Sequence, residues 1–285
     1  RRLRDRSARV RPIPHAAALS VASPAVVAPP PPLRATDALC AEAHARLVRR
    51  AIFECDKWDP QVGDGAALAR HALEIEAGAL AVLFARSERM AAELSAVERE
   101  LHGRAELHPM LGLPLACRLA LRQRAAPDVA ARVLRLDFHP TAEGFALSEV
   151  NSDVPGGYNE ASGVTALVSE ALGGALVPTG DPAAALATAV AARAGPSKRI
   201  AMVHATAYAD DRQVMAYLGR HLGARGCEPV PVGPDAVTFS RDRVEVHGGP
   251  VGAIVRFFPA EWLPSVALRA RWWRFFGGAS VPMAN

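Results

Sequence analysis

Apolar residues change their spacing along this chain, and the change separates a helical first part from a strand-rich last part. In the last part, an apolar run at 200–204 is followed by Val214, Leu218 and Leu222, which recur every four residues. A second run follows at 228–232. A strand, a helix and a strand in this order predict a parallel pair joined by a right-handed crossover. We therefore expect a Rossmann-like α/β unit in the last third of the chain.

The first part has apolar positions at helical spacing, which is typical of amphipathic helices. Thr36 is a good capping residue for a helix that runs to about Glu54. Gly78 predicts a break that divides 66–103 into two helices. The remaining expected elements are a loop at 58–65, a short helix ending near 122, helices at 160–172, 181–193 and 264–276, a hairpin of 237–239 and 244–246, and a strand at 251–257.

The segment 132–160 interrupts the helical pattern with alternating polar and apolar residues. Arg135 and Asp137 are two apart, and so are Glu149 and Asn151. Side chains two apart in a strand share one face, so each polar pair lies on one face. Turn residues at 139–144 separate the two runs. We expect an antiparallel hairpin whose apolar positions Leu134, Leu136 and Phe138 face the core.

Opposed positions in such a hairpin have a constant sum. If residue 138 opposes 148, Asp137 opposes Glu149 and Arg135 opposes Asn151. Two opposed carboxylates destabilise a sheet unless positive charge lies between them. One interpretation is a magnesium site formed by the Asp137, Glu149 and Asn151 oxygens, with Arg135 binding an anionic substrate group beside it. The other interpretation is a solvated polar face with an ion pair between Arg135 and a carboxylate.

The loop after this hairpin has residues suited to ligand binding. Gly156 and Gly157 allow close backbone approach, and Glu160 opens the next helix, where an anion would be attracted. Asp153 either serves the site or caps the loop. A second candidate patch follows the strand at 200–204. It consists of His204, Thr206, Tyr208 and Asp211.

The spacing R-x-D-x(11)-E-x-N, from Arg135 to Asn151, resembles the motif of the glutathionylspermidine synthase-like family. The resemblance covers residues 36–285 and is strongest at 132–161. It implies a circularly permuted ATP-grasp fold with a pre-ATP-grasp substrate unit, Mg²⁺ held by Asp137, Glu149 and Asn151, and Arg135 at the phosphorylated intermediate. Where glutathionylspermidine synthases have small hydroxyl residues, this chain has 154–157, Val-Pro-Gly-Gly, so glutathione is not the expected substrate.

The resemblance implies an ATP-dependent carboxylate–amine ligase that acts through an acyl phosphate. Lys57 and Lys198 are the only lysines, and neither lies in a glycine-rich loop. We therefore expect a fragment that ends before its ATP-binding module and is inactive alone, with substrate-binding roles for Arg135, Asp153 and the 156–160 loop. One alternative is a non-catalytic ligand-binding domain. Another is a Rossmann-like nucleotide binder, for which the expected acidic residue is not evident.

Charge and composition narrow the class of protein. Residues 1–34 hold seven Arg and one Asp, whereas the remainder has 26 basic and 28 acidic residues, so the overall charge of +4 comes from the tail. The folded part gives no reason to expect nucleic-acid binding. Four scattered cysteines predict a reducing cytoplasm, and no apolar run is long enough for a membrane span. We divide the chain into a disordered tail (1–35), a helical region with the hairpin (36–194) and the incomplete α/β unit (195–285).

Overall fold

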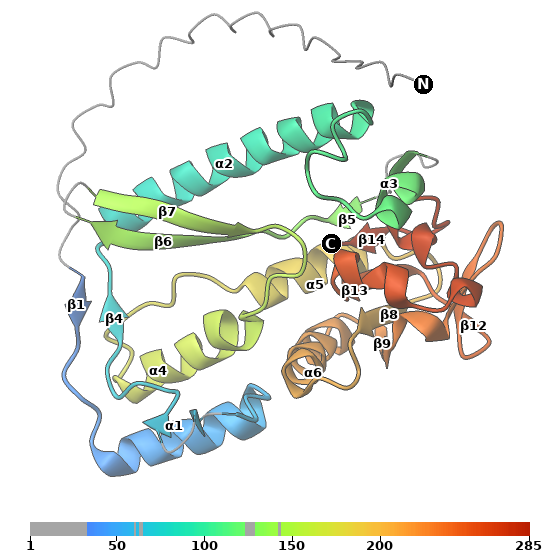
Figure 1. Ribbon diagram of the computed structural model, residues 1–285. Coiled ribbons are helices and arrows are strands. Elements are labelled where there is room, and N and C mark those ends of the chain that lie inside the picture. Colours follow the sequence, from blue (N-terminus) through green and yellow to red (C-terminus); the bar gives the residue numbers. More distant parts are fainter. Residues whose placement is uncertain (1–32, 60, 63–64, 123–128, 142–143) are drawn as a thin grey trace, which may run out of the picture.

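A five-stranded parallel sheet forms the centre of the molecule. The computed structural model describes residues 33–59, 61–62, 65–122, 129–141 and 144–285, so most of the predicted tail lies outside the described residues. The strand order is β5-β14-β13-β8-β9, and each neighbouring pair is parallel (Figure 1). The strands are β5 (Val129–Ala131), β8 (Arg199–His204), β9 (Glu228–Val232), β13 (Ala253–Phe257) and β14 (Met283–Ala284). The mixed α/β class with a parallel sheet is therefore confirmed.

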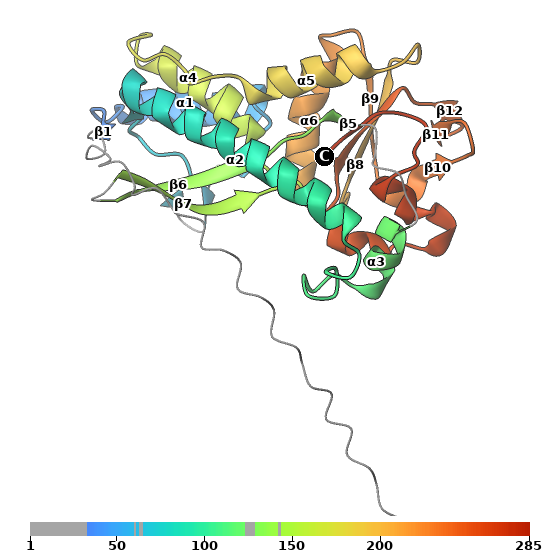
Figure 2. The ribbon, with the colours of Figure 1, turned by 90° about the horizontal axis from the view of Figure 1, so that it is seen from above.

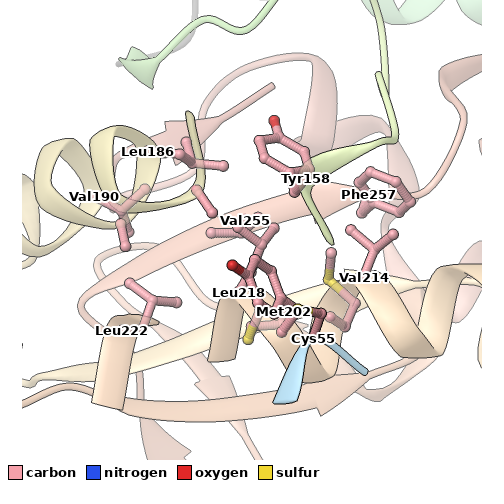
Figure 3. Packing of buried hydrophobic residues seen from close by; sticks show 14 of the residues in the cluster. Cys55, Tyr158, Leu186, Val190, Met202, Val214, Leu218, Leu222, Val255 and Phe257 are labelled. Carbon is pink, nitrogen blue, oxygen red and sulfur yellow. The ribbon is translucent and has the colours of Figure 1, made fainter. Parts of the chain in front are cut away.

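Two apolar layers cover the two faces of this sheet. On one face, Met202 and Val255 pack under α5 (Pro182–Arg193) and α6 (Ala209–Gly223) (Figure 3). On the other face, Val203 and Ile254 pack under a short helix, a small antiparallel sheet and several 3₁₀ turns. Strands covered on both faces need continuous apolar runs, which explains the sequences of β8 and β13. The covering elements are α3 (Leu115–Arg122), β10 (Val237–Phe239), β11 (Val244–Val246) and the 3₁₀ helices η3 (Ala260–Ser265) and η5 (Trp272–Phe276). Strand β12 (Gly249–Pro250) pairs with β11, and the 3₁₀ helix η4 (Leu268–Ala270) contacts β10.

An arm projects from the sheet. It consists of the two-stranded ribbon β6 (Arg135–Thr141) and β7 (Gly144–Asn151), with α2 (Ala77–Gly103) lying along it (Figure 2). The Arg86 guanidinium donates a 2.8 Å hydrogen bond to the Phe145 carbonyl, joining helix to ribbon. No residue of α2 is fully buried. The predicted core-facing residues Leu134, Leu136 and Phe138 are only partly buried, because one helix cannot enclose a two-stranded ribbon.

A third group of elements lies beside the arm. Helix α1 (Ala41–Glu54) packs against α4 (Thr165–Ala171) and the π-helical turn η1 (Asn159–Val164) (Figure 1). Small antiparallel pairs complete it: β1 (Arg34–Ala35) with β4 (Leu73–Glu74), and β2 (Gln61–Val62) with β3 (Gly65–Ala66). One apolar cluster contains Leu47 of α1, Val190 of α5 and Ile200 of β8, so it draws on both sides of the predicted boundary at residue 195.

Several predicted elements differ from the structure. The first helix begins at Ala41, because Thr36 instead exchanges hydrogen bonds with the backbone of Ala72. Gly78 causes no break, because it lies in the first turn of the continuous helix α2. The predicted helix 264–276 is a series of 3₁₀ turns, interrupted at Arg271 with φ of 49°. Residues 34–35, predicted as tail, and parts of the 58–65 loop form short strands.

Among the described helices, none is both long enough and apolar enough to cross a lipid bilayer.

Candidate functional site

The ribbon brings the four predicted motif residues together in the predicted register. Asp137 opposes Glu149, and Arg135 opposes Asn151. Beyond Asp137 the register shifts, so that Phe138 opposes Leu147 rather than residue 148. Ser148 is the additional residue of this bulge, and its hydroxyl donates a 3.0 Å hydrogen bond to the Asp137 carbonyl. The predicted pairing therefore holds for the polar positions, and beyond the bulge it is shifted by one residue. Sequence spacing alone did not reveal this shift.

Arg135 forms a forked ion pair with Asp137 on this face. Its Nε lies 2.8 Å from Oδ1 and its Nη2 lies 3.1 Å from Oδ2. These hydrogen bonds hold the pKa of the Asp137 carboxyl below its usual value and raise the pKa of Arg135. Both side chains keep access to water. The guanidinium thus neutralises one of the two opposed carboxylates, as the ion-pair interpretation requires.

The donor types on this face suit a hard cation. Two carboxylates and an amide oxygen are ligands that Mg²⁺ accepts, and Mg²⁺ usually takes few protein ligands. Arg135 donates one hydrogen bond to each oxygen of Asp137, so a metal bound through Asp137 would share these oxygens with the guanidinium. Over the described ranges, no cluster of three or more His, Cys, Asp or Glu side chains has metal-binding geometry. The face therefore fits a weak, water-accessible magnesium site better than a preformed cage.

A cavity with many charged lining residues lies elsewhere, at the carboxyl ends of β8 and β13. These strands are neighbours, but the chain continues from β8 toward β9 on one side and from β13 toward β14 on the other. Ligands of open α/β sheets bind where the strand order diverges in this way. The cavity has a volume of about 360 Å³, and we call it the switch-point cleft. Its polar and aromatic lining consists of Lys57, Asp59, Asn159, Glu160, Tyr208, Asp210, Asp211, Gln213, Phe257 and Trp262.

The predicted glycine loop forms part of this cleft. Gly156 and Gly157 both line it, and Gly157 has φ of 95°, which an L residue adopts only with strain. The loop leads into η1, a π-helical turn, and such turns are frequent at functional sites. Gly163 permits the tight packing of this turn, because a Cβ there would lie 2.5 Å from the Cys55 sulfur. Gly156 and Gly157 therefore border a cavity, and their predicted binding of a phosphate or carboxylate stays a prediction.

Asn159 is the buried polar residue of the η1 turn. Its side-chain nitrogen donates hydrogen bonds to the carbonyls of Cys55 (2.7 Å) and Gln213 (3.2 Å). Its Oδ1 has no hydrogen-bond partner among the described atoms, although the residue is only 1% exposed. A buried acceptor without a partner is costly and calls for an explanation. Because Asn159 lies in the cleft wall, a ligand that donates a hydrogen bond supplies one.

The cleft is strongly acidic. The lining residues include four carboxylates and one ammonium, a formal charge of −3. Lys57 contacts Asp59 at 3.0 Å and Glu160 at 2.8 Å. Partial burial opposes the charge on Lys57, but the hydrogen bonds to Glu160 and Asp59 outweigh burial and raise its pKa. Burial raises the pKa of Asp211, whose Oδ2 accepts a 3.3 Å hydrogen bond from the Ala205 backbone.

Aromatic rings form the outer wall of the cleft. Tyr208 and Trp262 have ring centroids 5.8 Å apart, and both are substantially exposed. Phe258 meets the Trp262 ring edge-on at 6.0 Å. Exposed aromatic faces beside carboxylates are an arrangement that attracts cations. Of the second predicted patch, Tyr208 and Asp211 line the cleft, whereas His204 is buried with its Nδ1 3.0 Å from the Met202 carbonyl, and Thr206 does not line the cleft.

Asp153 has a structural position rather than a place in the cleft. One of its oxygens accepts a hydrogen bond from the buried Arg256 guanidinium, and the other accepts one from the Ala260 backbone at 2.7 Å. It therefore fastens the glycine loop to the end of β13, and of its two predicted roles the loop-holding one fits these contacts.

Sequence reasoning missed Lys57, Asp59, Gln213 and Trp262 as lining residues. They come from the loop after α1, from α6 and from η3, and only tertiary structure brings them to one cavity. Their sequence signal is weak, although Lys57 stands between two aspartates in a loop.

No family model matches this chain, and a search of curated proteins found no similar one.

Proposed function

We propose that this chain is the substrate- and magnesium-binding part of an ATP-dependent carboxylate–amine ligase that acts through an acyl phosphate. The observation that carries the proposal is the ribbon register, which pairs Asp137 with Glu149 and Arg135 with Asn151. The same four residues form the motif that resembles the glutathionylspermidine synthase-like, pre-ATP-grasp family. The proposal includes ATP as a co-substrate bound by a module outside this chain.

In this proposal the ribbon face carries the charge-neutralising groups. Asp137, Glu149 and Asn151 would hold Mg²⁺, which supplies positive charge to a phosphoryl group when bound. Arg135 would exchange its contact with Asp137 for one with the anionic substrate, since its planar fork suits carboxylate and phosphate equally well. The forked pair thus keeps the guanidinium oriented before the substrate binds.

The switch-point cleft supports an amine as one partner of the reaction. Its charge of −3, the exposed Tyr208 and Trp262 rings and the unpartnered Asn159 Oδ1 all favour a cationic hydrogen-bond donor. This chemistry is the opposite of the anion expected from the glycine loop alone. Four carboxylates around Gly156 and Gly157 outweigh the attraction of backbone amides for an anion.

A specific observation favours the alternative, a non-catalytic ligand-binding domain with the same fold. Arg135 satisfies both oxygens of Asp137, so the ribbon face is electrostatically complete for that carboxylate without metal. In that case the cleft would bind a cation while the ribbon has only a structural role.

Titration with Mn²⁺, a spectroscopic substitute for Mg²⁺, distinguishes the ligase proposal from the binding-domain alternative. We expect a single weak site, observed by electron paramagnetic resonance and displaced by Mg²⁺. Asp137→Asn and Glu149→Gln should each weaken it about tenfold or more. Glu88→Gln, which removes an exposed carboxylate of the same arm, is the matched control and should bind Mn²⁺ normally.

Activity provides the second readout. In the full-length protein, Asp137→Ala or Glu149→Ala should abolish magnesium-dependent ADP release while circular dichroism stays unchanged. Normal Mn²⁺ binding and normal ADP release in these variants would remove the ligase proposal and leave the binding-domain alternative.

A further inference from the structure

A second cavity opens on the opposite face of the same strand edge. It has a volume of about 600 Å³, in the range of small-molecule sites. It lies where β5 ends at Arg132 and where β13 presents Arg256, and the last turns of α2 close it with Arg99 and His102. Arg256 lines this cavity, whereas the next residue, Phe257, lines the switch-point cleft. Because neighbouring side chains of a strand point to opposite faces, the two cavities lie on either side of β13.

The second cavity has the opposite charge to the cleft. Three arginines line it against one carboxylate, Glu98, which is paired with Arg132. Arg256 is only 7% exposed and is held by Asp153 and by the Phe258 carbonyl at 2.7 Å. Within the described part of the chain, Arg99 has no ion pair or hydrogen bond. The Arg99 guanidinium is therefore available for a ligand at the rim of the cavity, whereas the Arg256 guanidinium is fixed at its base.

The remainder of the cavity is apolar. Phe275 and Phe276 of η5, Leu121 of α3 and Met283 of β14 form its wall. Val129 of β5 also lines it and remains 45% exposed, although it lies on a strand of the central sheet. An apolar residue that is partly exposed at a sheet edge, next to cationic side chains, is suited to contact the body of an amphipathic anion.

We propose that this second cavity binds a monocarboxylate with an apolar body. The inference goes beyond the proposed function and does not depend on it. The carboxylate contacts Arg99 and Arg132, and the apolar body lies against Phe276 and Val129. The acidic cleft and the cationic cavity then bind ligands of opposite charge on the two faces of one strand end, with the Asp153–Arg256 pair between them.

Calorimetric titration with 3-phenylpropanoate tests this inference without metal or ATP. We expect saturable binding of one equivalent, and the neutral analogue 3-phenylpropanamide should bind about tenfold more weakly or not at all, because it lacks the charge that the arginines recognise. Equal affinity for the acid and the amide would overturn the proposal.

Three variants locate the binding. Arg99→Gln should weaken 3-phenylpropanoate binding about tenfold, and Val129→Glu should abolish it by placing a negative charge against the ligand. Arg89→Gln, on the same helix but lining a different cavity, should leave the affinity unchanged. Equal weakening by Arg89→Gln and Arg99→Gln would show non-specific attraction to a basic surface and would overturn the proposal.

The results separate this inference from the proposed function. Loss of Mn²⁺ binding in Asp137→Asn together with no 3-phenylpropanoate binding leaves the ligase proposal intact and removes the second site. Specific 3-phenylpropanoate binding with unaltered Mn²⁺ binding in Asp137→Asn removes the metal role of the ribbon and keeps the second site.

Discussion

The central sheet and the arm differ in how far their residues are buried. Every residue of β13 is buried, whereas no residue of β6 is fully buried and none of α2 is. The sheet is covered on both faces by separate apolar layers. The arm has one helix on a two-stranded ribbon, which is the least that keeps a ribbon folded. The comparison shows that the motif residues lie on the less buried region, while the cleft lies at the end of the fully buried strand β13. We therefore expect the arm to be the less stable of the two regions.

Truncation of core residues should give the largest difference between the two regions. Ile254→Ala, in the fully buried centre of β13, should cost about 2–5 kcal/mol of unfolding free energy. Phe138→Ala, on the partly buried ribbon, should cost less than half as much although it removes a larger side chain. Urea denaturation followed by circular dichroism measures both. Equal costs would mean that the ribbon is enclosed as fully as the sheet.

Removing the Asp153 carboxylate should give the next largest effect. Asp153→Ala leaves the buried Arg256 without its ion-pair partner and the Ala260 amide without its acceptor, which should cost about 2–3 kcal/mol. Asp153→Asn, which keeps an acceptor oxygen, should cost less. Thermal unfolding measures both variants. If both are as stable as the original protein, Asp153 does not hold the glycine loop to the sheet.

The smallest effects concern the pH dependence of two carboxylates, one in each region. Burial raises the pKa of Asp211 above its unfolded-state value. The contribution of Asp211 to the free energy of unfolding is therefore present at low pH and is lost as the pH rises through the folded-state pKa. Arg135 lowers the pKa of Asp137 below its unfolded-state value. The contribution of Asp137 to the free energy of unfolding is therefore present above the unfolded-state pKa and is lost as the pH falls through the folded-state pKa.

Asparagine substitutions at Asp211 and Asp137 test whether the two contributions to stability depend on pH with opposite signs. Relative to the original protein, Asp211→Asn should become more stable between pH 3 and pH 7, by about 0.5 kcal/mol. Asp137→Asn should become relatively less stable over the same range. Denaturation midpoints at pH 3, 5 and 7 provide the comparison, and slopes of the same sign would contradict it.

The sheet was the easier region to predict from the sequence. Continuous apolar runs identified β8 and β13, because burial on both faces demands them. Strands β5 and β14 were both missed, since runs of two or three residues carry no pattern and these strands form only by pairing within the sheet. The predicted helix at 264–276 failed because helical spacing of aromatic residues also suits successive 3₁₀ turns that bury Trp272 and Phe275.

The candidate site was predictable only where its residues are close in sequence. Period-two spacing and turn residues were enough to place Arg135, Asp137, Glu149 and Asn151 on paired positions. The cleft instead depends on contacts between residues that are distant in sequence, such as the ion pair of Lys57 with Glu160. The packing of α1 on η1 brings these two residues together. The charge of −3 is a property of that packing, which the sequence of the glycine loop alone does not reveal.

The π-helical turn η1 has a consequence for how this surface can evolve. Such a turn holds one more residue than an α-helical turn of the same length. Deleting a single residue between Asn159 and Val164 would restore regular helix and turn Asn159 by about 100° around the axis relative to α4. Asn159 would then lose its hydrogen bonds to the carbonyls of Cys55 and Gln213. The additional residue of this turn therefore determines which side chain faces the cleft.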